Sequence, residues 1–325
     1  MGFKLGIGIA LALALSQAKA TWGALIPGHI LITDSSAQAV IDVNPTTGTQ
    51  TIVSSGGLLA HPGGIALMPD GFLAVTDRST ASVIRVNPTG GTQSLITSGG
   101  YLVDPYNLAV ANSDTLIVSD TDSFGGPGGL IKVDPTTGVQ TPAAQGGNFI
   151  KVFGVAIPNA GAYYVGDRGP QAAGFDGSII QVNATTGAQS VIASGGLLAN
   201  PDHLIVTATG DILDADHDSP DGAGGVIRIN PSNGAQTMIS SHGFFNGGVS
   251  GIALDPSGGI YVSDSNAFGG NGGIIHVDLA TGNQSAVSSG GFFVDPGVMA
   301  VVPTPELAAS VWLLARALLV TRRNR

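Results

Sequence analysis

The 325-residue sequence contains no cysteine, and Glu306 is its only glutamate. The absence of cysteine excludes disulfide bonds, thiol catalysis and cysteine-ligated metals, so packing alone must hold the fold. Basic residues are also scarce: residues 21–302 contain six lysines and arginines against 21 aspartates, a net formal charge of −15. Because phosphate binding requires a basic surface, we expect no nucleic-acid partner. The acidic surface fits a cation as ligand, or serves only to keep a glycine-rich protein soluble.

Residues 1–20 differ in composition from the residues that follow. They contain Lys4, an apolar run over Leu5–Leu15, and the sequence Ala18-Lys19-Ala20 immediately before Thr21. This order is typical of a secretory signal peptide with a small-x-small cleavage site; the alternative is a buried N-terminal helix. We therefore expect an exported protein, located in the periplasm, in the cell envelope or outside the cell.

Residues 62–105 contain a unit that recurs along the chain. Turn sequences such as Pro69-Asp70-Gly71 separate four short apolar runs within it. The runs are too short for helices and rich in β-branched residues, which indicates strands. The four runs are Gly64–Leu67, Phe72–Thr76, Ser82–Val86 and Gln93–Ile96. Each unit is therefore predicted to be a four-stranded antiparallel meander.

Two residue types mark the repeat. A Gly-x-Gln sequence begins each fourth strand, at intervals of 43, 47, 49, 47 and 48 residues: Gln50, Gln93, Gln140, Gln189, Gln236 and Gln284. An aspartate ends each second strand: Asp34, Asp77, Asp120, Asp167, Asp216 and Asp264. Four strands in a period of this length indicate β-propeller blades. The aspartates are expected to cap the turns that follow them rather than to act in catalysis.

The number of first strands predicts how the ring closes. These strands begin near Gly64, Asn107, Gly154, His203, Gly251 and Val298. The last of these strands, Val298–Val302, is not followed by the other three strands of a repeat. Conversely, the three strands at the start of the mature chain are not preceded by the strand that opens a repeat. Those three strands are His29–Thr33, Ala39–Val43 and Gln50–Val53. Pairing the two leftovers gives an all-β, six-bladed β-propeller over residues 21–302 without open sheet edges.

The repeat has a recognisable sequence pattern. Pro62–Leu67 reads Pro-x-Gly-Ile-Ala-Leu, and it is followed by Asp70-Gly71 and by a Val-x-Asp sequence at Val75–Asp77. This pattern resembles the NHL-repeat, gluconolactonase-like and streptogramin-lyase-like propellers, over roughly residues 28–302. The resemblance implies the architecture more than an activity, because such folds host many functions.

Residues 303–325 form a segment of different composition. Pro303-Thr304-Pro305-Glu306 is followed by the apolar run Leu307–Val320, which contains Arg316, and then by a basic end, Thr321–Arg325. This order resembles the PEP-CTERM sorting signal and implies a transient membrane contact. The run of 14 residues is shorter than the ~20 needed to span a bilayer. The alternative is a C-terminal amphipathic helix on the propeller surface.

The central mouth of a propeller is the expected ligand site. Polar residues replace the usual glycine at the start of two innermost strands, Asn107 and His203, and they either form a site or only bond locally. With their neighbours they define a candidate ligand site of Tyr106, Asn107, Lys151, Asp202 and His203. The resemblance to gluconolactonase-like enzymes implies Asp202, in Pro201-Asp202-His203-Leu204, as a divalent-metal ligand. The glutamate ligand of those enzymes has no counterpart before Glu306.

A second candidate site lies in the fourth repeat. It consists of Asp214, Asp216, Asp218 and Asp221, whereas other repeats have valine at the position of Asp214. In a strand, side chains two residues apart share a face, so Asp214 and Asp216 are expected to project together. Like charges this close repel unless a cation or a proton offsets them, and calcium accepts oxygen ligands from loops. Calcium is therefore the predicted cofactor, and the alternative is a solvated acidic loop.

These features favour an exported, envelope-associated or secreted propeller that acts as a monomeric, non-enzymatic binding or scaffold protein. Its expected ligand is an extracellular glycan, a protein or a cation at the mouth. The alternative is a metal-dependent hydrolase, lactonase-like, or a lyase that acts at the same mouth. A metal with an acid/base pair would distinguish the alternative, and the sequence offers only Asp202 and His203 for that pair.

Overall fold

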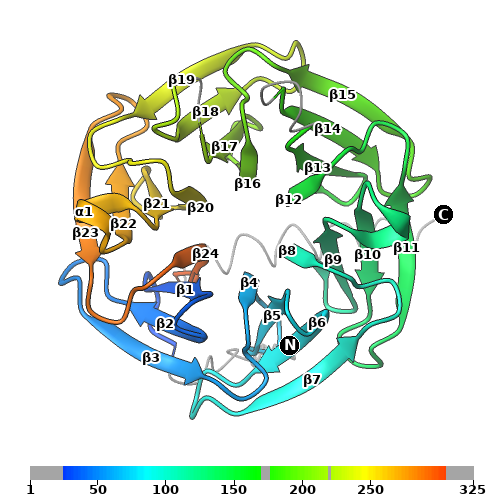
Figure 1. The fold of residues 1–325 in the computed structure, drawn as a ribbon, viewed down its shortest axis with the longest axis horizontal. Helices are drawn as coiled ribbons and strands as arrows, with labels where there is room; N and C mark the ends of the chain where they lie inside the picture. The colour runs from blue at the N-terminus through cyan, green and yellow to red at the C-terminus, as the bar shows by residue number, and fades with distance from the viewer. Residues whose placement is uncertain (1–24, 170–175, 219–220, 305–325) are drawn as a thin grey trace, which may run out of the picture.

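The computed structural model describes residues 25–169, 176–218 and 221–304, which form a ring of six sheets (Figure 1). Each sheet has four strands, so the predicted six-bladed β-propeller is confirmed. In five sheets the strands follow chain order from the axis outward, and in the sixth the last strand of the chain is innermost. The predicted signal peptide, residues 1–20, and residues 305–325 of the predicted sorting segment lie outside the described residues. Within the described ranges, no helix is long and apolar enough to cross a membrane.

The blades are numbered here from the first complete repeat. Blades 1 to 3 are β4–β7 (Pro62–Leu67, Leu73–Asp77, Ser82–Val86, Gln93–Ser98), β8–β11 (Pro105–Asn112, Thr115–Asp120, Gly129–Val133, Gln140–Gln145) and β12–β15 (Val152–Asn159, Ala162–Asp167, Ser178–Asn183, Gln189–Ser194). Blades 4 and 5 are β16–β19 (Pro201–Val206, Ile212–Asp216, Gly225–Ile229, Gln236–Ser241) and β20–β23 (Val249–Leu254, Ile260–Asp264, Gly273–Val277, Gln284–Ser289). Blade 6 is β24 (Pro296–Val301) with β1–β3 (Ile30–Asp34, Ala39–Val43, Gln50–Ser55). Two short helical turns follow second strands: η1 (Ser123–Gly125) and α1 (Ala267–Gly270).

Both ends of the described chain build blade 6, as the count of first strands predicts. The C-terminal strand β24 pairs antiparallel with β1, with Ile30 opposite Val301 and Leu31 opposite Ala300. β1 pairs in turn with β2, and β2 with β3. The pairing gives blade 6 its fourth strand, so none of the six blades is left incomplete.

The hydrophobic core lies between neighbouring blades. One cluster contains Leu31 and Val40 of blade 6 together with Val75 and Ile84 of blade 1, all fully buried. The β-branched residues that predict the strands therefore face an adjacent sheet on each side. This packing holds the blades together without disulfides, as the absence of cysteine requires.

The aspartates that end the second strands are structural, as predicted. Asp77 accepts backbone N–H groups of Ala60 and His61, each at 2.7 Å, and that of Thr80 at 3.0 Å. The same role falls to the five others: Asp34, Asp120, Asp167, Asp216 and Asp264. Each carboxylate thus fixes the loop that leads into an innermost strand as well as the turn that follows the second strand.

The repeated glutamines fasten the loops that join the blades. Gln93 donates from Nε2 to the carbonyl of Gly56 at 3.0 Å, and its Oε1 accepts the N–H of Leu58 at 2.6 Å. Gly57, between them, has a φ of +62°, and a Cβ there would lie 2.7 Å from Gln93 Oε1. Only glycine therefore fits this position, and a glycine stands there opposite each of the six glutamines: Gly57, Gly100, Gly147, Gly196, Gly243 and Gly291.

Candidate functional site

The upper face carries the starts of the innermost strands, and the end of the central channel there is called the upper mouth. Tyr106, Phe153 and Asp202 occupy equivalent positions in β8, β12 and β16 on this mouth. The rings of Tyr106 and Phe153 meet edge to face, with centroids 4.5 Å apart. Arg168 lies with its guanidinium carbon 3.5 Å from the centroid of Phe153, and Arg78 lies 4.9 Å from that of Tyr106. Cation–π attraction therefore orders both arginines against the aromatic rings.

Each of these arginines is also paired with an aspartate. Arg168 Nη2 donates to Asp202 Oδ2 at 2.9 Å, and the Asp202 side chain is only 1% exposed. Arg78 donates from Nε and Nη2 to the two oxygens of Asp104, at 2.7 and 2.8 Å. The hydrogen bond from Arg78 contributes to holding the pKa of Asp104 below its usual range, against the opposing effect of burial. The mouth of blades 1 to 4 therefore carries fixed, neutralised ion pairs.

Tyr106 stays protonated in this setting. Burial raises the pKa of its phenol, and the negative charge of Asp202 raises the pKa further. A phenol of this kind donates hydrogen bonds but supplies no base near neutral pH. Tyr106 and Asp202, two of the predicted ligand residues, are therefore brought together by the fold.

The other predicted ligand residues are held elsewhere. Lys151 pairs with Asp122 of the β9–η1 turn, outside the Arg168–Asp202 pair. Asn107 is fully buried; its Oδ1 accepts the N–H of Leu108 at 2.6 Å, and its Nδ2 has no partner. The Nδ1 of His203 accepts the N–H of Ile252 in blade 5 at 3.1 Å. Asp202 and His203 thus contact opposite neighbouring blades and do not form an acid/base pair.

The environment of His203 keeps its imidazole neutral. Burial lowers its pKa to about 4, because a charged ring there would lose its hydration. Its Nδ1 is an acceptor, so the ring proton is assigned to Nε2. At neutral pH this side chain therefore serves as a hydrogen-bonding link between blades 4 and 5.

The four aspartates of the predicted calcium site have separate surroundings. Asp216 accepts the backbone N–H groups of Ala199 and Asn200, and Asp218 accepts the Asn200 amide at 2.7 Å. Asp221 pairs with His242 at 2.9 Å. Within the described residues, no group of three or more histidine or acidic side chains is arranged to hold a metal. Calcium at these residues stays a prediction.

Asp214 differs from the other three because, among the described residues, its buried carboxylate has no side-chain hydrogen-bond partner, and only the backbone N–H of Asp202 lies near enough to favour its charged form. Burial raises its pKa well above the usual range, and the neighbouring Asp216 and Asp202 charges raise the pKa further. One oxygen of Asp202 and the Nε of Arg168 are also buried without partners. The contact between blades 3 and 4 therefore contains several polar atoms that are unsatisfied.

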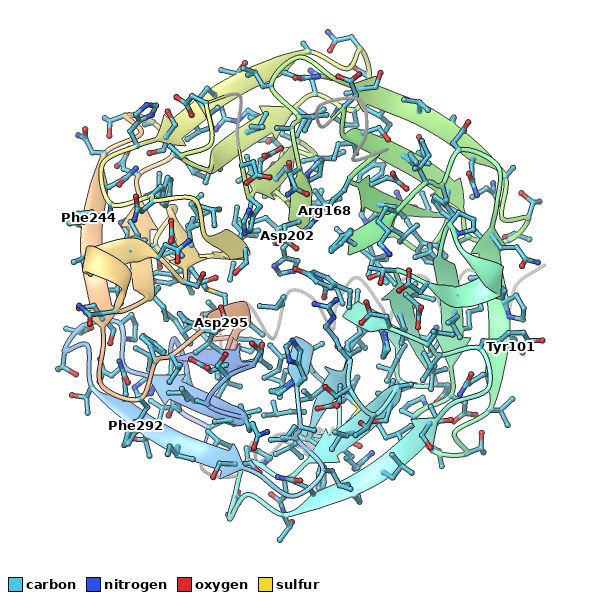
Figure 2. The ribbon with its side chains drawn as sticks, viewed as in Figure 1. Tyr101, Arg168, Asp202, Phe244, Phe292 and Asp295 are labelled. Carbon is cyan, nitrogen blue, oxygen red and sulfur yellow. The ribbon has the colours of Figure 1, made fainter. Side chains whose placement is uncertain are left out.

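Exposed apolar side chains surround the upper mouth. They lie in the loops between the fourth strand of one blade and the innermost strand of the next, and they are 38–60% exposed: Leu58, Tyr101, Val103, Ile150, Phe244, Phe292 and Val294. These residues are called the upper rim. Figure 2 places Tyr101, Phe244 and Phe292 in the outer part of the ring, around the central Arg168 and Asp202.

Two rim aromatics are supported by strained neighbours. Tyr101 stacks with Phe124 of η1 in blade 2, with ring centroids 5.5 Å apart, and Phe244 stacks with Phe268 of α1 in blade 5 at 5.0 Å. Phe124 and Phe268 have left-handed φ angles of 57° and 54°, which are uncommon for bulky residues. The two pairs lie on opposite sides of the ring (Figure 2). Strain of this kind concentrates at binding surfaces.

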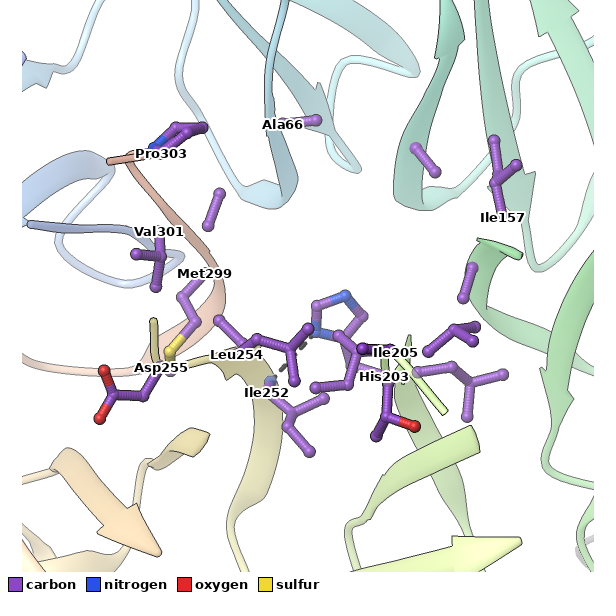
Figure 3. Close-up of a pocket in the computed structure, with 18 of the residues that line it drawn as sticks. Ala66, Ile157, His203, Ile205, Ile252, Leu254, Asp255, Met299, Val301 and Pro303 are labelled. Atoms are coloured by element: carbon purple, nitrogen blue, oxygen red, sulfur yellow. Dashed lines mark hydrogen bonds between the residues drawn. The ribbon is translucent and has the colours of Figure 1, made fainter. Parts of the chain in front are cut away.

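A cavity of about 1020 Å³ occupies the lower part of the channel. All six innermost strands line it with apolar residues near their ends, including Ile157, Ile205, Leu254 and Val301 (Figure 3). His203 lies in its wall with the bond to Ile252 drawn in Figure 3. The cavity is therefore apolar, in contrast to the charged upper mouth.

The arrangement defines a six-bladed β-propeller with a charged upper mouth, an apolar rim and an apolar lower cavity. No family model matches the chain, and no curated protein matches it. Among solved structures, a chain of a nidogen/laminin complex is similar at a TM-score of 0.68 and 14% identity, covering 84% of this chain and 98% of that one.

Two further structures share the fold. TolB from Acinetobacter baumannii is similar at a TM-score of 0.61 and 13% identity, covering 85% of this chain and 67% of that one. A putative gluconolactonase is similar at a TM-score of 0.55 and 16% identity, covering 74% and 83%. At these identities the likeness establishes the fold alone, and function has to be argued from the surface and the mouth.

Proposed function

We propose that this protein is an exported, non-enzymatic propeller that binds a protein partner on its upper face. The observation that carries the proposal is the upper rim, where seven large apolar side chains are exposed on one face. Large exposed apolar side chains gathered on one face are typical of protein–protein contact surfaces, and here they stand in separate groups around the ring, with Tyr101 and Phe244 on opposite sides (Figure 2). Tyrosine and phenylalanine are among the residues enriched in such surfaces.

The charged mouth fits the same function. The Arg78–Asp104 and Arg168–Asp202 pairs are fixed by stacking on Tyr106 and Phe153. Fixed charges in the middle of a contact surface select a partner with complementary charges and suppress wrong partners. The similarity to a chain found in a nidogen/laminin complex supports a binding role, since it is an assembly of this fold with a protein.

The enzymatic alternative is a metal-dependent, lactonase-like hydrolase at the upper mouth. Asp202 is the residue that the resemblance to gluconolactonase-like enzymes offers, and it is committed to Arg168. His203, the other half of an acid/base pair, is bonded to blade 5 and neutral. These contacts favour binding over hydrolysis. Turnover of a lactone panel that is lost in Asp202→Asn would reverse this preference.

Export and membrane sorting remain part of the proposal on sequence grounds. Residues 1–20 supply the expected signal peptide, and residues 303–325 supply the expected sorting segment and a transient membrane contact. The propeller is proposed to act as a monomer, since each of its six blades already has four strands and none needs a strand from another copy. Mass spectrometry of the native protein tests export: an intact N-terminus in the cytoplasm would contradict it.

Photocrosslinking identifies the partner directly. A photoreactive phenylalanine analogue replaces Tyr101 on the upper rim or, as control, Leu95, which is 52% exposed on the outermost strand β7. The proposal predicts one dominant crosslinked protein at Tyr101 and none at Leu95. A glycan array that gives binding while no protein is captured would replace the protein partner by a glycan.

A further inference from the structure

The lower cavity is open although its wall is apolar. An apolar residue at or near the end of each innermost strand contributes to the lining, so six apolar side chains form a ring at the lower end: Leu67, Val110, Ile157, Val206, Leu254 and Val301. Leu254 is 40% exposed, and the other five are half-buried. Exposed apolar surface of this extent is costly in water, so the ring is expected to be covered.

The chain continues from the rim of this cavity. Pro303 is part of the lining, and the described residues end at Thr304. Only Pro305 and Glu306 separate Thr304 from the apolar run Leu307–Val320. The three steps from Thr304 to Leu307 span at most about 11 Å, so the run is tethered within reach of the cavity. A short tether of this kind gives an effective concentration in the millimolar range.

We propose that the lower cavity is the docking site for the chain's own C-terminal run, Leu307–Val320. Helical spacing of 100° per residue would place Leu307, Val311, Leu314 and Leu318 on one face. Arg316 would lie opposite, flanked by the apolar Trp312, Leu313, Leu319 and Val320. Fourteen residues of helix would be ~21 Å long and 10–12 Å wide, too large to enter a cavity of about 1020 Å³ whole, so the run would lie across its opening. The apolar face then covers the ring of six side chains, and Arg316 stays in solvent.

Charge complementarity supports the same occupant. The turns around the lower end of the channel carry Asp70, which is paired with Arg85, together with Asp114 and Asp211. The cavity lining holds Asp211, Asp255 and one basic residue, Arg228, so acidic side chains are in excess at this end. The C-terminal segment carries Arg316, Arg322, Arg323 and Arg325. A basic segment that reaches this face is attracted to it, whereas another acidic copy of the propeller would be repelled.

Docking would give the run two exclusive positions. The apolar side chains of the C-terminal run would either cover the cavity or enter a membrane. Docking would therefore shield them until a membrane competes with the cavity for them. This inference does not depend on the partner of the upper rim, because the lower cavity lies at the other end of the channel. Failure of either proposal therefore leaves the other standing.

The absence of cysteine makes a crosslinking test unambiguous. In the full chain, with residues 305–325 verified by mass spectrometry, Leu254→Cys is combined with Leu314→Cys and oxidised at low protein concentration. A disulfide forms only where the two Cα atoms approach to within ~7 Å. The matched control combines Leu314→Cys with Leu95→Cys, on the outermost strand β7. The proposal predicts an intramolecular disulfide at Leu254 at least about tenfold faster than at Leu95.

A second pair of variants separates docking from random collision of the tail. Leu254→Asp places a charge in the apolar ring, and Leu95→Asp places one on an exposed outer site. With Leu314→Cys crosslinked to an introduced Ile157→Cys instead, Leu254→Asp should slow disulfide formation, and Leu95→Asp should not. Equal rates at Leu254 and Leu95, or only intermolecular disulfides, would overturn the proposal.

Discussion

Gln50 donates from Nε2 to the carbonyl oxygen of Gly290, 3.0 Å away and 240 residues later in the chain. Its Oε1 accepts the N–H of Phe292 at 2.7 Å, and Nε2 also reaches Ser288 Oγ at 2.9 Å. The bonds to a backbone carbonyl and a backbone N–H recur at the other five glutamines, for example from Gln140 to Gly99 at 3.0 Å. At Gln50, however, the contact joins the first described blade strands to the last ones. The ring is therefore closed by the same side chain that positions an upper-rim residue.

Removing this contact is expected to loosen the closure. Gln50→Ala leaves a carbonyl and an N–H of the Gly290–Phe292 turn without partners, which costs about 1–3 kcal/mol. Gln140→Ala is the matched control, because it removes the same bonds between segments close in sequence. Hydrogen exchange should accelerate in β24 for Gln50→Ala and not for Gln140→Ala. Equal protection of β24 in both variants would mean that strand pairing alone closes the ring.

Asp214→Val is expected to stabilise the protein. Asp214 is buried with no side-chain hydrogen-bond partner among the described residues, and valine occupies the equivalent position in blades 1, 2, 3 and 5. Relieving an unsatisfied buried group should raise the free energy of unfolding by about 1–3 kcal/mol. Thermal unfolding measures this gain, and a lower Tm for Asp214→Val would show that the carboxylate has a ligand.

The gain from Asp214→Val should depend on pH. The folded-state pKa of Asp214 is raised by burial, so the acid is favoured in its neutral form. The contribution of neutral Asp214 to the free energy of unfolding is therefore fully present below the unfolded-state pKa, near 4. It is lost as the pH rises through the folded-state pKa. The advantage of valine should grow as the pH rises above about 4. Ile32→Val, at the equivalent position of β1 in blade 6, changes no titratable group and should show no such pH dependence.

The Arg168–Asp202 pair is expected to be strongly coupled. Arg168→Met leaves the buried Asp202 carboxylate unpaired, which typically costs about 3–5 kcal/mol. Asp202→Leu leaves the arginine without its partner, while the double variant removes both charges and should recover most of the loss. A double-mutant cycle by chemical denaturation measures the coupling. Additive losses would show that the two side chains act independently.

Calcium binding has a direct test. Isothermal titration with millimolar calcium should give heat and a higher Tm for the wild type if Asp214, Asp216, Asp218 and Asp221 bind the ion. Asp214→Asn removes one charge but leaves the backbone bonds of Asp216 intact, so it should abolish binding without unfolding the loop. Absence of heat and of a thermal shift in the wild type would end the calcium prediction.

The fold could be predicted from the sequence because its determinants are local and repeated. The predicted runs Ser82–Val86 and Ala39–Val43 coincide with β6 and β2, since turn residues bound them on both sides. The orphan strand ending at Val302 predicted the closure because it lacked partners in sequence.

The site was less accessible to sequence analysis because its contacts join different blades. Arg168 follows the strand-ending Asp167, and nothing local shows that it stacks on Phe153 and pairs with Asp202. The one sequence feature that could have pointed to Arg168 as a site residue is the scarcity of basic residues in this chain. The rim was hidden in a similar way: Tyr101 is exposed while its neighbour Leu102 is buried, and both are apolar. Their exposure depends on how Gln140 and Asp120 hold the loop.

The central claim is that the upper rim binds a protein partner. The most direct measurement is the Kd of the partner captured at Tyr101, determined by calorimetry for three forms of the full chain. Tyr101→Ser with Phe292→Ser should weaken binding by about 30-fold or more, as the loss of an aromatic anchor does. The matched control, Leu95→Ser with Val139→Ser, removes comparably exposed apolar side chains away from the rim and should leave Kd unchanged. Equal affinity for all three forms would contradict the account.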